Sequence, residues 1–178
     1  ILHQHSTNTI PSNSMKTAIV YSSNHGTTAK VARRIQLGLG EDKTRLFNLK
    51  NVRRIDLSPY ERVLIGGSIH AGSVQKRVRK FIDTHFHELV EKPLGLFLCC
   101  MDEQRAESEF ENAFPEALRS HAICCKIIGG EFLFEKMNII EKAMVKKVAG
   151  VESSVSRIND HKIDELVEEM NHAMEGEK

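Results

Sequence analysis

The sequence predicts an α/β fold, an open doubly wound sheet of five parallel strands between two layers of helices (α/β/α). Short runs that are apolar throughout alternate with longer segments in which apolar residues recur at helical spacing. Strands without polar alternation are typical of a parallel sheet buried on both faces, and strands separated by helices are typical of βαβ units. Such sheets bind ligands at the carboxyl ends of their strands, so we expect a ligand site there.

The strands are expected in apolar runs that end at turn residues. The first run breaks at Ser22, the third follows the turn at Pro59, and the fourth, after Pro93, is the most hydrophobic of the chain. The fifth is broken by two glycines, Gly129 and Gly130. The expected strands are residues 17–21, 44–49, 62–67 and 94–101, and a fifth that begins at 123.

The helices are expected where apolar residues recur every three or four positions. The first closes at Gly38 and Gly40, and the third is bent or restarted at Pro115. The last has Ile163 and Leu166 on its inward face. The expected helices are residues 28–39, 74–90, 106–121, 136–149 and 160–174.

Composition excludes several classes of partner. Lysine and arginine number 25 against 24 acidic residues, and a net charge of +1 gives no strong field for nucleic acid. No apolar run reaches the roughly 18 residues of a membrane-spanning helix. The cysteines form two adjacent pairs, Cys99–Cys100 and Cys124–Cys125, which predict free thiols in a reducing cytoplasm rather than a disulfide framework.

The first fourteen residues are polar and aperiodic and lack a signal-peptide pattern. We interpret residues 1–14 as an expression leader, with the natural start at Met15 and a single domain over residues 15–178. A natural disordered tail is the alternative for residues 1–14.

The segment between the first strand and the first helix, residues 22–28, favours an anion site. It lacks the Gly-Lys-Ser/Thr end of a Walker A loop, and its single glycine, Gly26, does not match a dinucleotide-binding turn. Backbone N–H groups at a helix N-terminus favour an anion, and hydroxyl side chains add donors without charge. A plain helix cap with a turn is the alternative. The candidate phosphate ligands are Ser23, Asn24, His25, Gly26, Thr27 and Thr28.

Three segments, in this order, resemble the flavodoxin family. Residues 20–28 are similar to its phosphate loop, with His25 in place of the middle threonine. Residues 60–72 are similar to its third strand and flavin-flanking loop, and residues 96–102 to its fourth strand and second flavin loop. The resemblance implies the strand order 2-1-3-4-5 and FMN as cofactor. It also implies flavin contacts from Ser68, Ile69, His70, Ala71, Gly72, Cys100, Met101 and Asp102.

Within the family, the chain is most similar to menaquinone-dependent protoporphyrinogen oxidases. It shares their Gly-x-Ser-Ile-x-x-Gly loop at residues 66–72. Residues 132–149 and the Gly-Val-Glu that follows are similar to their insertion near the fifth strand. Flavodoxins are strongly acidic, whereas this chain is near neutral, and the difference argues against a generic ferredoxin substitute.

The expected flavin loops lack the stacking aromatics of flavodoxins. The chain has no Trp. His70 stands at the Trp position and could stack on the flavin, and Met101 in the second loop could pack on its other face. Ala71 stands where flavodoxins have a glycine whose peptide flips on reduction, and an alanine in that conformation costs on the order of 1 kcal/mol. We therefore expect weak FMN binding and two-electron rather than one-electron chemistry.

A metal site is not expected. His85 and His87 are two positions apart on a helix and do not share a face, and adjacent cysteines on a strand point to opposite faces. A structural zinc site needs four converging ligands.

The segment from Lys136 to Ala149 has an amphipathic helical pattern. Four lysines lie among its polar positions. One interpretation is a helix that packs on the domain, and the other is an exposed helix that contacts a membrane surface or shields a quinone. Its apolar stripe is Leu133, Met137, Ile140, Met144 and Val148.

Three functions remain open from the sequence. The first is an FMN-binding redox protein that transfers electrons through the flavin, and the second is a quinone-dependent dehydrogenase of the protoporphyrinogen oxidase type. The third is a flavin-free flavodoxin-like binding module. The expected partner is a redox protein or a quinone, and whether the chain is an enzyme is left open.

Overall fold

The computed structural model describes residues 15–70 and 72–173. The leader expected at residues 1–14, the site position Ala71 and the expected end of the last helix at residue 174 lie outside the described residues.

Five parallel strands form the central sheet, in the order β2-β1-β3-β5-β6. This is the expected order 2-1-3-4-5 for the five parallel strands. The strand order reverses at β1 and β3. The chain passes from β1 to β2 on one side, and then returns to place β3 on the other side of β1. The bounds are β1 Thr17–Tyr21, β2 Thr44–Asn48, β3 Arg62–His70, β5 Leu94–Cys99 and β6 Cys124–Gly129.

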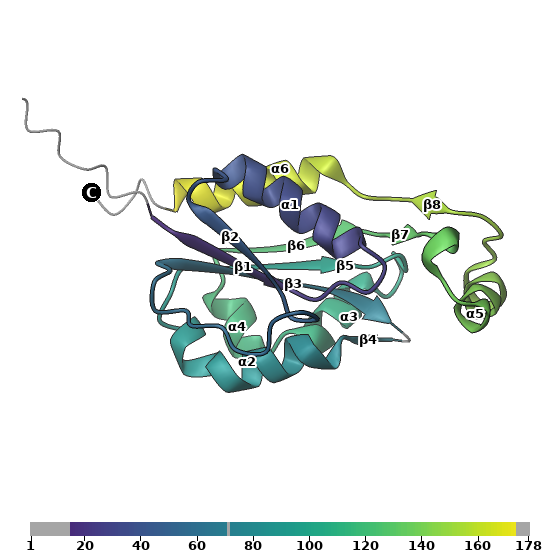
Figure 1. Ribbon diagram of the computed structural model, residues 1–178, viewed down its shortest axis with the longest axis horizontal. Coiled ribbons are helices and arrows are strands. Elements are labelled where there is room, and N and C mark those ends of the chain that lie inside the picture. The colour runs from purple at the N-terminus through teal and green to yellow at the C-terminus, as the bar shows by residue number, and fades with distance from the viewer. Residues whose placement is uncertain (1–14, 71, 174–178) are drawn as a thin grey trace, which may run out of the picture.

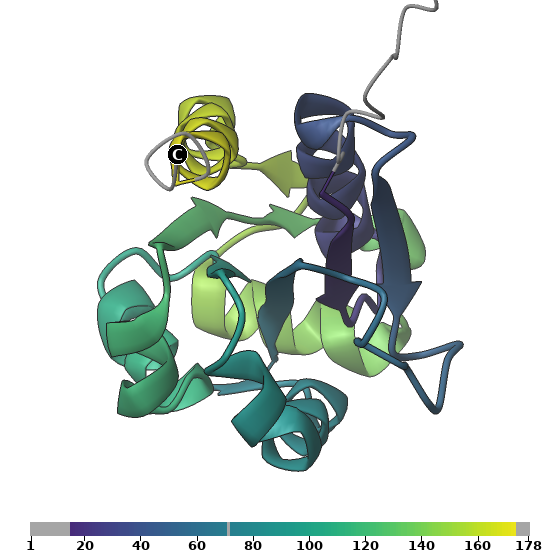
Figure 2. The same ribbon diagram turned by 90° about the vertical axis from the view of Figure 1, so that its left-hand side faces the viewer.

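Helices cover both faces of this sheet (Figures 1 and 2). The chain after Leu94 alternates sides: Leu96 packs into the core beneath α2 and α3, whereas Phe97 packs into the core beneath α1 and α6. The third expected helix is broken at Pro115, as predicted, into α3 and α4. The bounds are α1 Thr27–Leu39 and α6 Asp160–His172 on one face, with α2 Lys76–Leu89, α3 Ala106–Ala113 and α4 Glu116–His121 on the other.

The third strand is longer than predicted and ends in a hairpin. It continues to His70 and pairs antiparallel with β4, Ser73–Val74, so that Ile69 lies opposite Val74. Gly72, with φ 75°, lies in the turn. The prediction of a loop is therefore wrong at Ser68, Ile69 and His70, which lie on a strand. The prediction that the next helix begins at Val74 is also wrong, because α2 begins at Lys76. Ser68 pairs with Cys99 of β5, and the β-branched pair of Ile69 and Val74 continues the strand into the hairpin.

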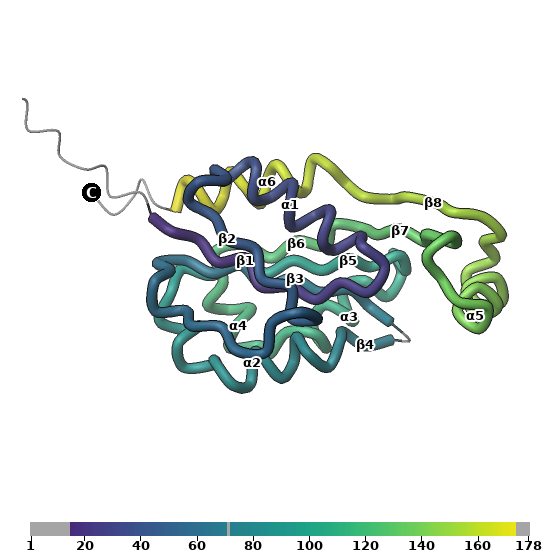
Figure 3. The backbone as a smooth tube through the Cα atoms, in the orientation of Figure 1, coloured from purple at the N-terminus to yellow at the C-terminus, as the bar shows by residue number. Residues whose placement is uncertain are grey.

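The chain between Glu131 and Ser156, here called the insertion segment, leaves the edge of the sheet. Two short strands, β7 Glu131–Phe132 and β8 Val155–Ser156, pair antiparallel and carry a 3₁₀ turn, Phe134–Lys136, and the helix α5, Ile139–Ala149 (Figure 3). The helix expected from residue 136 begins only at Ile139. Asn138 and Glu141 form a capping box there, which fixes the start.

Helix α5 does not pack its apolar stripe on the domain. None of its residues is buried, and Ile139 and Ile140 are 85% and 75% exposed. Met144 and Val148 are also exposed. The interpretation that α5 packs its apolar stripe on the domain is therefore wrong. Helix α5 lies at one end of the molecule (Figure 1).

Candidate functional site

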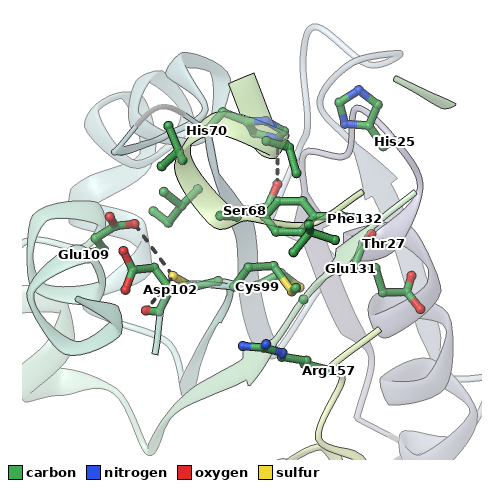
Figure 4. Close-up of a pocket in the computed structure, with 18 of the residues that line it drawn as sticks. His25, Thr27, Ser68, His70, Cys99, Asp102, Glu109, Glu131, Phe132 and Arg157 are labelled. Atoms are coloured by element: carbon green, nitrogen blue, oxygen red, sulfur yellow. Dashed lines mark hydrogen bonds between the residues drawn. The ribbon is translucent and has the colours of Figure 1, made fainter. Parts of the chain in front are cut away.

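A pocket of about 730 Å³ lies at the carboxyl ends of β1, β3 and β5, where the fold predicts it (Figure 4). Its volume is within the usual range for cofactor sites. Gly26 lies in the same loop as the first residues of the lining, and Ala71 is outside the described residues. The predicted site residues that line the pocket are Ser23, Asn24, His25, Thr27, Thr28, Ser68, Ile69, His70, Gly72, Cys100, Met101 and Asp102.

The loop between β1 and α1 presents an uncapped helix N-terminus. Gly26 is the N-cap residue, with φ 103°, a conformation that side chains disfavour, and its N–H donates to Ser23 Oγ at 3.1 Å. The helix has no side-chain cap and no acidic residue in its first turn. Thr27 and Thr28 are buried at this end. The N–H groups of the first turn have no acceptor within the helix, so this end of the helix, with these hydroxyls, has the donors that an anion would need.

Lys136 of the insertion segment lies against this loop. Its Nζ is 3.1 Å from the position that a Cβ on Gly26 would occupy. Among the described carboxylates, none forms an ion pair with Lys136, whereas nearby Lys30 is paired with Glu131 at 2.8 Å. Lys136 is exposed, and its ammonium group adds positive charge beside the partial positive charge of the helix N-terminus.

A polar network occupies the hairpin side of the pocket. Ser68 Oγ lies 3.1 Å from His70 Nε2 (Figure 4) and accepts a hydrogen bond from Gln75 Nε2 at 2.7 Å. The ring centroids of His70 and His25 are 5.7 Å apart. His25 Nε2 lies 3.4 Å from Glu141 Oε1. Burial lowers the pKa of His70, and the neighbouring His25 lowers it further.

The end of β5 and the loop that follows it supply no nucleophile. Burial raises the pKa of the Cys99 thiol to about 12 and that of Cys100 to about 11, so both are protonated at neutral pH. The Asp102 carboxylate accepts a hydrogen bond from Arg105 Nε at 2.7 Å, which lowers its pKa. Met101 packs against Gly130. The loop therefore shapes the pocket, and its acid is already held by Arg105.

The insertion segment forms a wall of the pocket that the sequence did not predict. Phe132, which is half-buried, brings an aromatic ring to a site without Trp. Met137, Met144 and Val148 were predicted as a helix stripe, and that pattern could have indicated a pocket wall. The other unpredicted lining residues of this segment are Glu131, Glu141, Val145, Ala149 and Val151. Outside the segment, the unpredicted lining residues are Cys99, Glu103, Gln104, Arg105, Glu109, Gly130 and Arg157.

Two further features concern only residues 15–70 and 72–173. No group of three or more His, Cys, Asp or Glu side chains there is arranged to hold a metal ion. No helix there is long and apolar enough to cross a membrane.

The strand order, the hydroxyl-rich loop after β1 and the pocket at the strand ends define a class, the doubly wound α/β proteins with a ligand site at the reversal of strand order. A family model described as "Flavodoxin domain" matches residues 18–157. The chain belongs to the flavodoxin family.

Solved structures share the fold at low identity. A Fusobacterium nucleatum flavodoxin bound to flavin mononucleotide is 13% identical, with a TM-score of 0.55 over 89% of this chain and 98% of that one. Rubredoxin oxygen:oxidoreductase of Desulfovibrio gigas is 14% identical, with a TM-score of 0.53 over 88% of this chain and 37% of that one. The Flv1 flavodiiron core of Synechocystis is 12% identical, with a TM-score of 0.56 over 94% and 38%.

The chain thus spans nearly all of a flavodoxin but less than two fifths of the two larger proteins. At these identities the likeness shows the fold alone. No curated protein matches the chain at a significant level.

Proposed function

We propose that this chain binds FMN in the pocket and transfers electrons through it. The observation that carries the proposal is the uncapped N-terminus of α1 with Lys136 facing it, in a chain of the flavodoxin family. Neutral hydroxyl and N–H donors with one ammonium group fit a phosphomonoester, and the residues that would hold it are Ser23, Asn24, His25, Gly26, Thr27, Thr28 and Lys136.

The rest of the pocket fits a flat ring system. His70 and Phe132 offer aromatic rings, and Met101 offers a polarisable side chain. Met144, Val145 and Val148 of α5 line this side of the pocket and would cover a bound ring. When bound, FMN supplies the one- or two-electron transfer, and the protein's part is to bind, orient and shield it.

Reconstitution tests the proposal. The full chain, incubated with FMN and freed of excess by gel filtration, is expected to retain one FMN per chain, with a shifted visible absorbance band. Retention of no FMN, at micromolar protein and FMN, would contradict the proposal and favour the flavin-free binding module.

A second candidate is a quinone-dependent dehydrogenase of the protoporphyrinogen oxidase type. The observation that favours it is the apolar wall of Met137, Met144, Val145 and Val148, which suits an apolar ring substrate beside the flavin. The FMN-loaded chain is then expected to oxidise protoporphyrinogen when a menaquinone analogue is present. Reduction and reoxidation of the flavin by a protein partner, without that turnover, would favour the electron carrier.

We also propose that the segment from Lys136 to Ala149 contacts an anionic membrane surface peripherally. Ile140 and Val148 are exposed on α5, and Lys142, Lys146 and Lys147 add positive charge. The chain should co-sediment with phosphatidylglycerol vesicles but not with phosphatidylcholine vesicles. The substitution Ile140→Glu should abolish co-sedimentation, and Leu37→Glu, at an exposed leucine of α1, should not.

A further inference from the structure

The buried side chain of Gln75 has only one orientation that satisfies its neighbours. The backbone N–H of Ser68 can only donate, so the amide atom 2.9 Å from it is the oxygen, Oε1. The amide nitrogen of Gln75 then faces the carbonyl oxygen of Ser22 at 3.2 Å and Ser68 Oγ at 2.7 Å. Gln75 therefore donates to the Ser68 hydroxyl.

The Ser68 hydroxyl has one acceptor among the described residues. Its oxygen accepts from Gln75 Nε2, and its O–H faces His70 Nε2, at 3.1 Å. Donation to Nε2 satisfies this O–H, whereas a proton on Nε2 would leave it without a described acceptor. A ring nitrogen that accepts a hydrogen bond carries no proton, so the His70 imidazole is neutral and its proton is on Nδ1.

The charged groups around His70 agree with a neutral ring. Burial of the ring between the hairpin and the insertion segment is the main cause of its lowered pKa. His25, from the loop after β1, adds to this effect, and Glu141, from α5, opposes it but already lies beside His25.

We propose that Gln75 and Ser68 are positioning residues that hold His70 as a neutral hydrogen-bond donor to the ligand of this pocket. His70 lines the pocket, and its Nδ1 donates to no other described residue. The matching ligand atom is a neutral acceptor, a carbonyl oxygen or an unprotonated ring nitrogen, and the FMN ring carries both. The identity of this acceptor rests on the proposed function, whereas the tautomer does not.

Nuclear magnetic resonance tests the tautomer directly. Long-range ¹H–¹⁵N spectra of the full chain distinguish Nδ1–H from Nε2–H imidazoles, and His70→Gln assigns the signal. The wild type is expected as the neutral Nδ1–H form, with a midpoint below the ordinary histidine value of about 6.5. In Ser68→Ala, which removes the donor to Nε2, the ring should shift toward Nε2–H. In Gln75→Glu, the carboxylate should accept a hydrogen bond from the Ser68 O–H, which leaves Nε2 free to carry a proton and raises the midpoint of the His70 titration.

The matched control is Ser73→Ala, opposite His70 in the hairpin and exposed, which should leave the tautomer unchanged. An Nε2–H ring in the wild type, or a tautomer that neither Ser68→Ala nor Gln75→Glu changes, would overturn the proposed hydrogen-bond chain from Gln75 through Ser68 to His70.

Addition of FMN tests the donor role separately. The His70 Nδ1–H resonance should move on binding, and His70→Phe, which keeps a ring but loses the donor, should weaken FMN binding about three- to tenfold. A wild type that binds FMN as tightly as His70→Phe would overturn the donor role. A wild type that binds no FMN at all would instead overturn the proposed function.

Discussion

His25 Nε2, on the loop after β1, lies 3.4 Å from Glu141 Oε1, on α5. This contact joins the candidate phosphate site to a helix that has no buried residue of its own. The insertion segment is otherwise held near that loop by Lys136 against Gly26 and by Glu131 with Lys30. The wall of the pocket is therefore attached mainly by polar contacts, which can be weakened one at a time.

Glu141→Gln should loosen α5 without unfolding it. Glutamine still completes the capping box with Asn138, but the charge beside His25 is lost. We expect faster amide hydrogen exchange in residues 139–149 and FMN binding about two- to fivefold weaker, the size of effect typical of a partly exposed polar contact. Glu152→Gln, at an exposed position, is the control. Equal exchange in both variants would show that the pair does not hold α5.

The same contact should depend on pH. The backbone N–H of Asn138 is the main cause of the lowered pKa of Glu141, and His25 contributes. A carboxyl group whose pKa is lowered on folding stabilises the attached state above its unfolded pKa of about 4.3, and the effect is lost as pH falls through the lowered value. Exchange in residues 139–149 should therefore increase below about pH 4, before that in β1. Loss of exchange protection in β1 and in residues 139–149 at the same pH would contradict local detachment of α5.

Lys136→Gln should discriminate between FMN and riboflavin. The ammonium group faces the loop that would hold the phosphate, so its loss should weaken FMN binding about three- to tenfold, and less at high salt. Riboflavin, which lacks the phosphate, should bind as it does to the wild type. Lys147→Gln, an exposed lysine of α5, is the matched control. An equal loss for both flavins would assign Lys136 to the wall alone.

Gly26→Val should abolish tight FMN binding. A side chain at φ 103° is strained and meets the Lys136 ammonium, so the loop must move. Gly40→Val is the control, because Gly40 has φ 99° at the other end of the same helix. Both substitutions should lower the free energy of unfolding by about 1–2 kcal/mol. Only Gly26→Val should reduce FMN affinity, by tenfold or more. Equal FMN affinities of Gly26→Val and Gly40→Val would show that the phosphate does not bind at this loop.

The cysteines should differ in reactivity with a thiol reagent. Cys125 is exposed, whereas Cys99, Cys100 and Cys124 are buried, with pKa values raised by burial to about 12, 11 and 12. Partial burial also raises the pKa of Cys125, but its exposure should make it react first, as one equivalent, and Cys125→Ser should remove that equivalent. The others should react on unfolding. Fast labelling of Cys99 in the folded chain would contradict its place in the core.

The parallel sheet could be predicted because its strands are apolar on both faces. The runs around Ile19, Ile65 and Leu96 are buried by helices on either side, and this leaves a strong local pattern. The loop at Gly26 could be predicted as a ligand site because it follows the first strand, and ligands of doubly wound sheets bind at the carboxyl ends of the strands. Both features depend on nearby sequence.

The hairpin and the two short strands of the insertion segment could not be predicted from the residue pattern, because each pairing involves only two residues on each strand. The polar residues Ser68 and His70 suggest a loop, but Ser68 pairs with Cys99 of β5, and the strand continues by pairing with β4 in the hairpin. Phe132 reaches the pocket because β7 pairs with β8, whose strand has only two residues. An amphipathic stripe also does not indicate which face of a helix is covered, so the exposure of α5 had to come from the structure.

Fluorescence titration of FMN with the full chain tests the central claim most directly. The free flavin is fluorescent, and burial against aromatic and thioether side chains should quench it. We expect saturable quenching at one FMN per chain and riboflavin binding at least tenfold weaker, since it lacks the phosphate that the N-terminus of α1 would hold. Equal affinities for the two flavins, or no quenching at all, would contradict the assignment of this pocket as an FMN site.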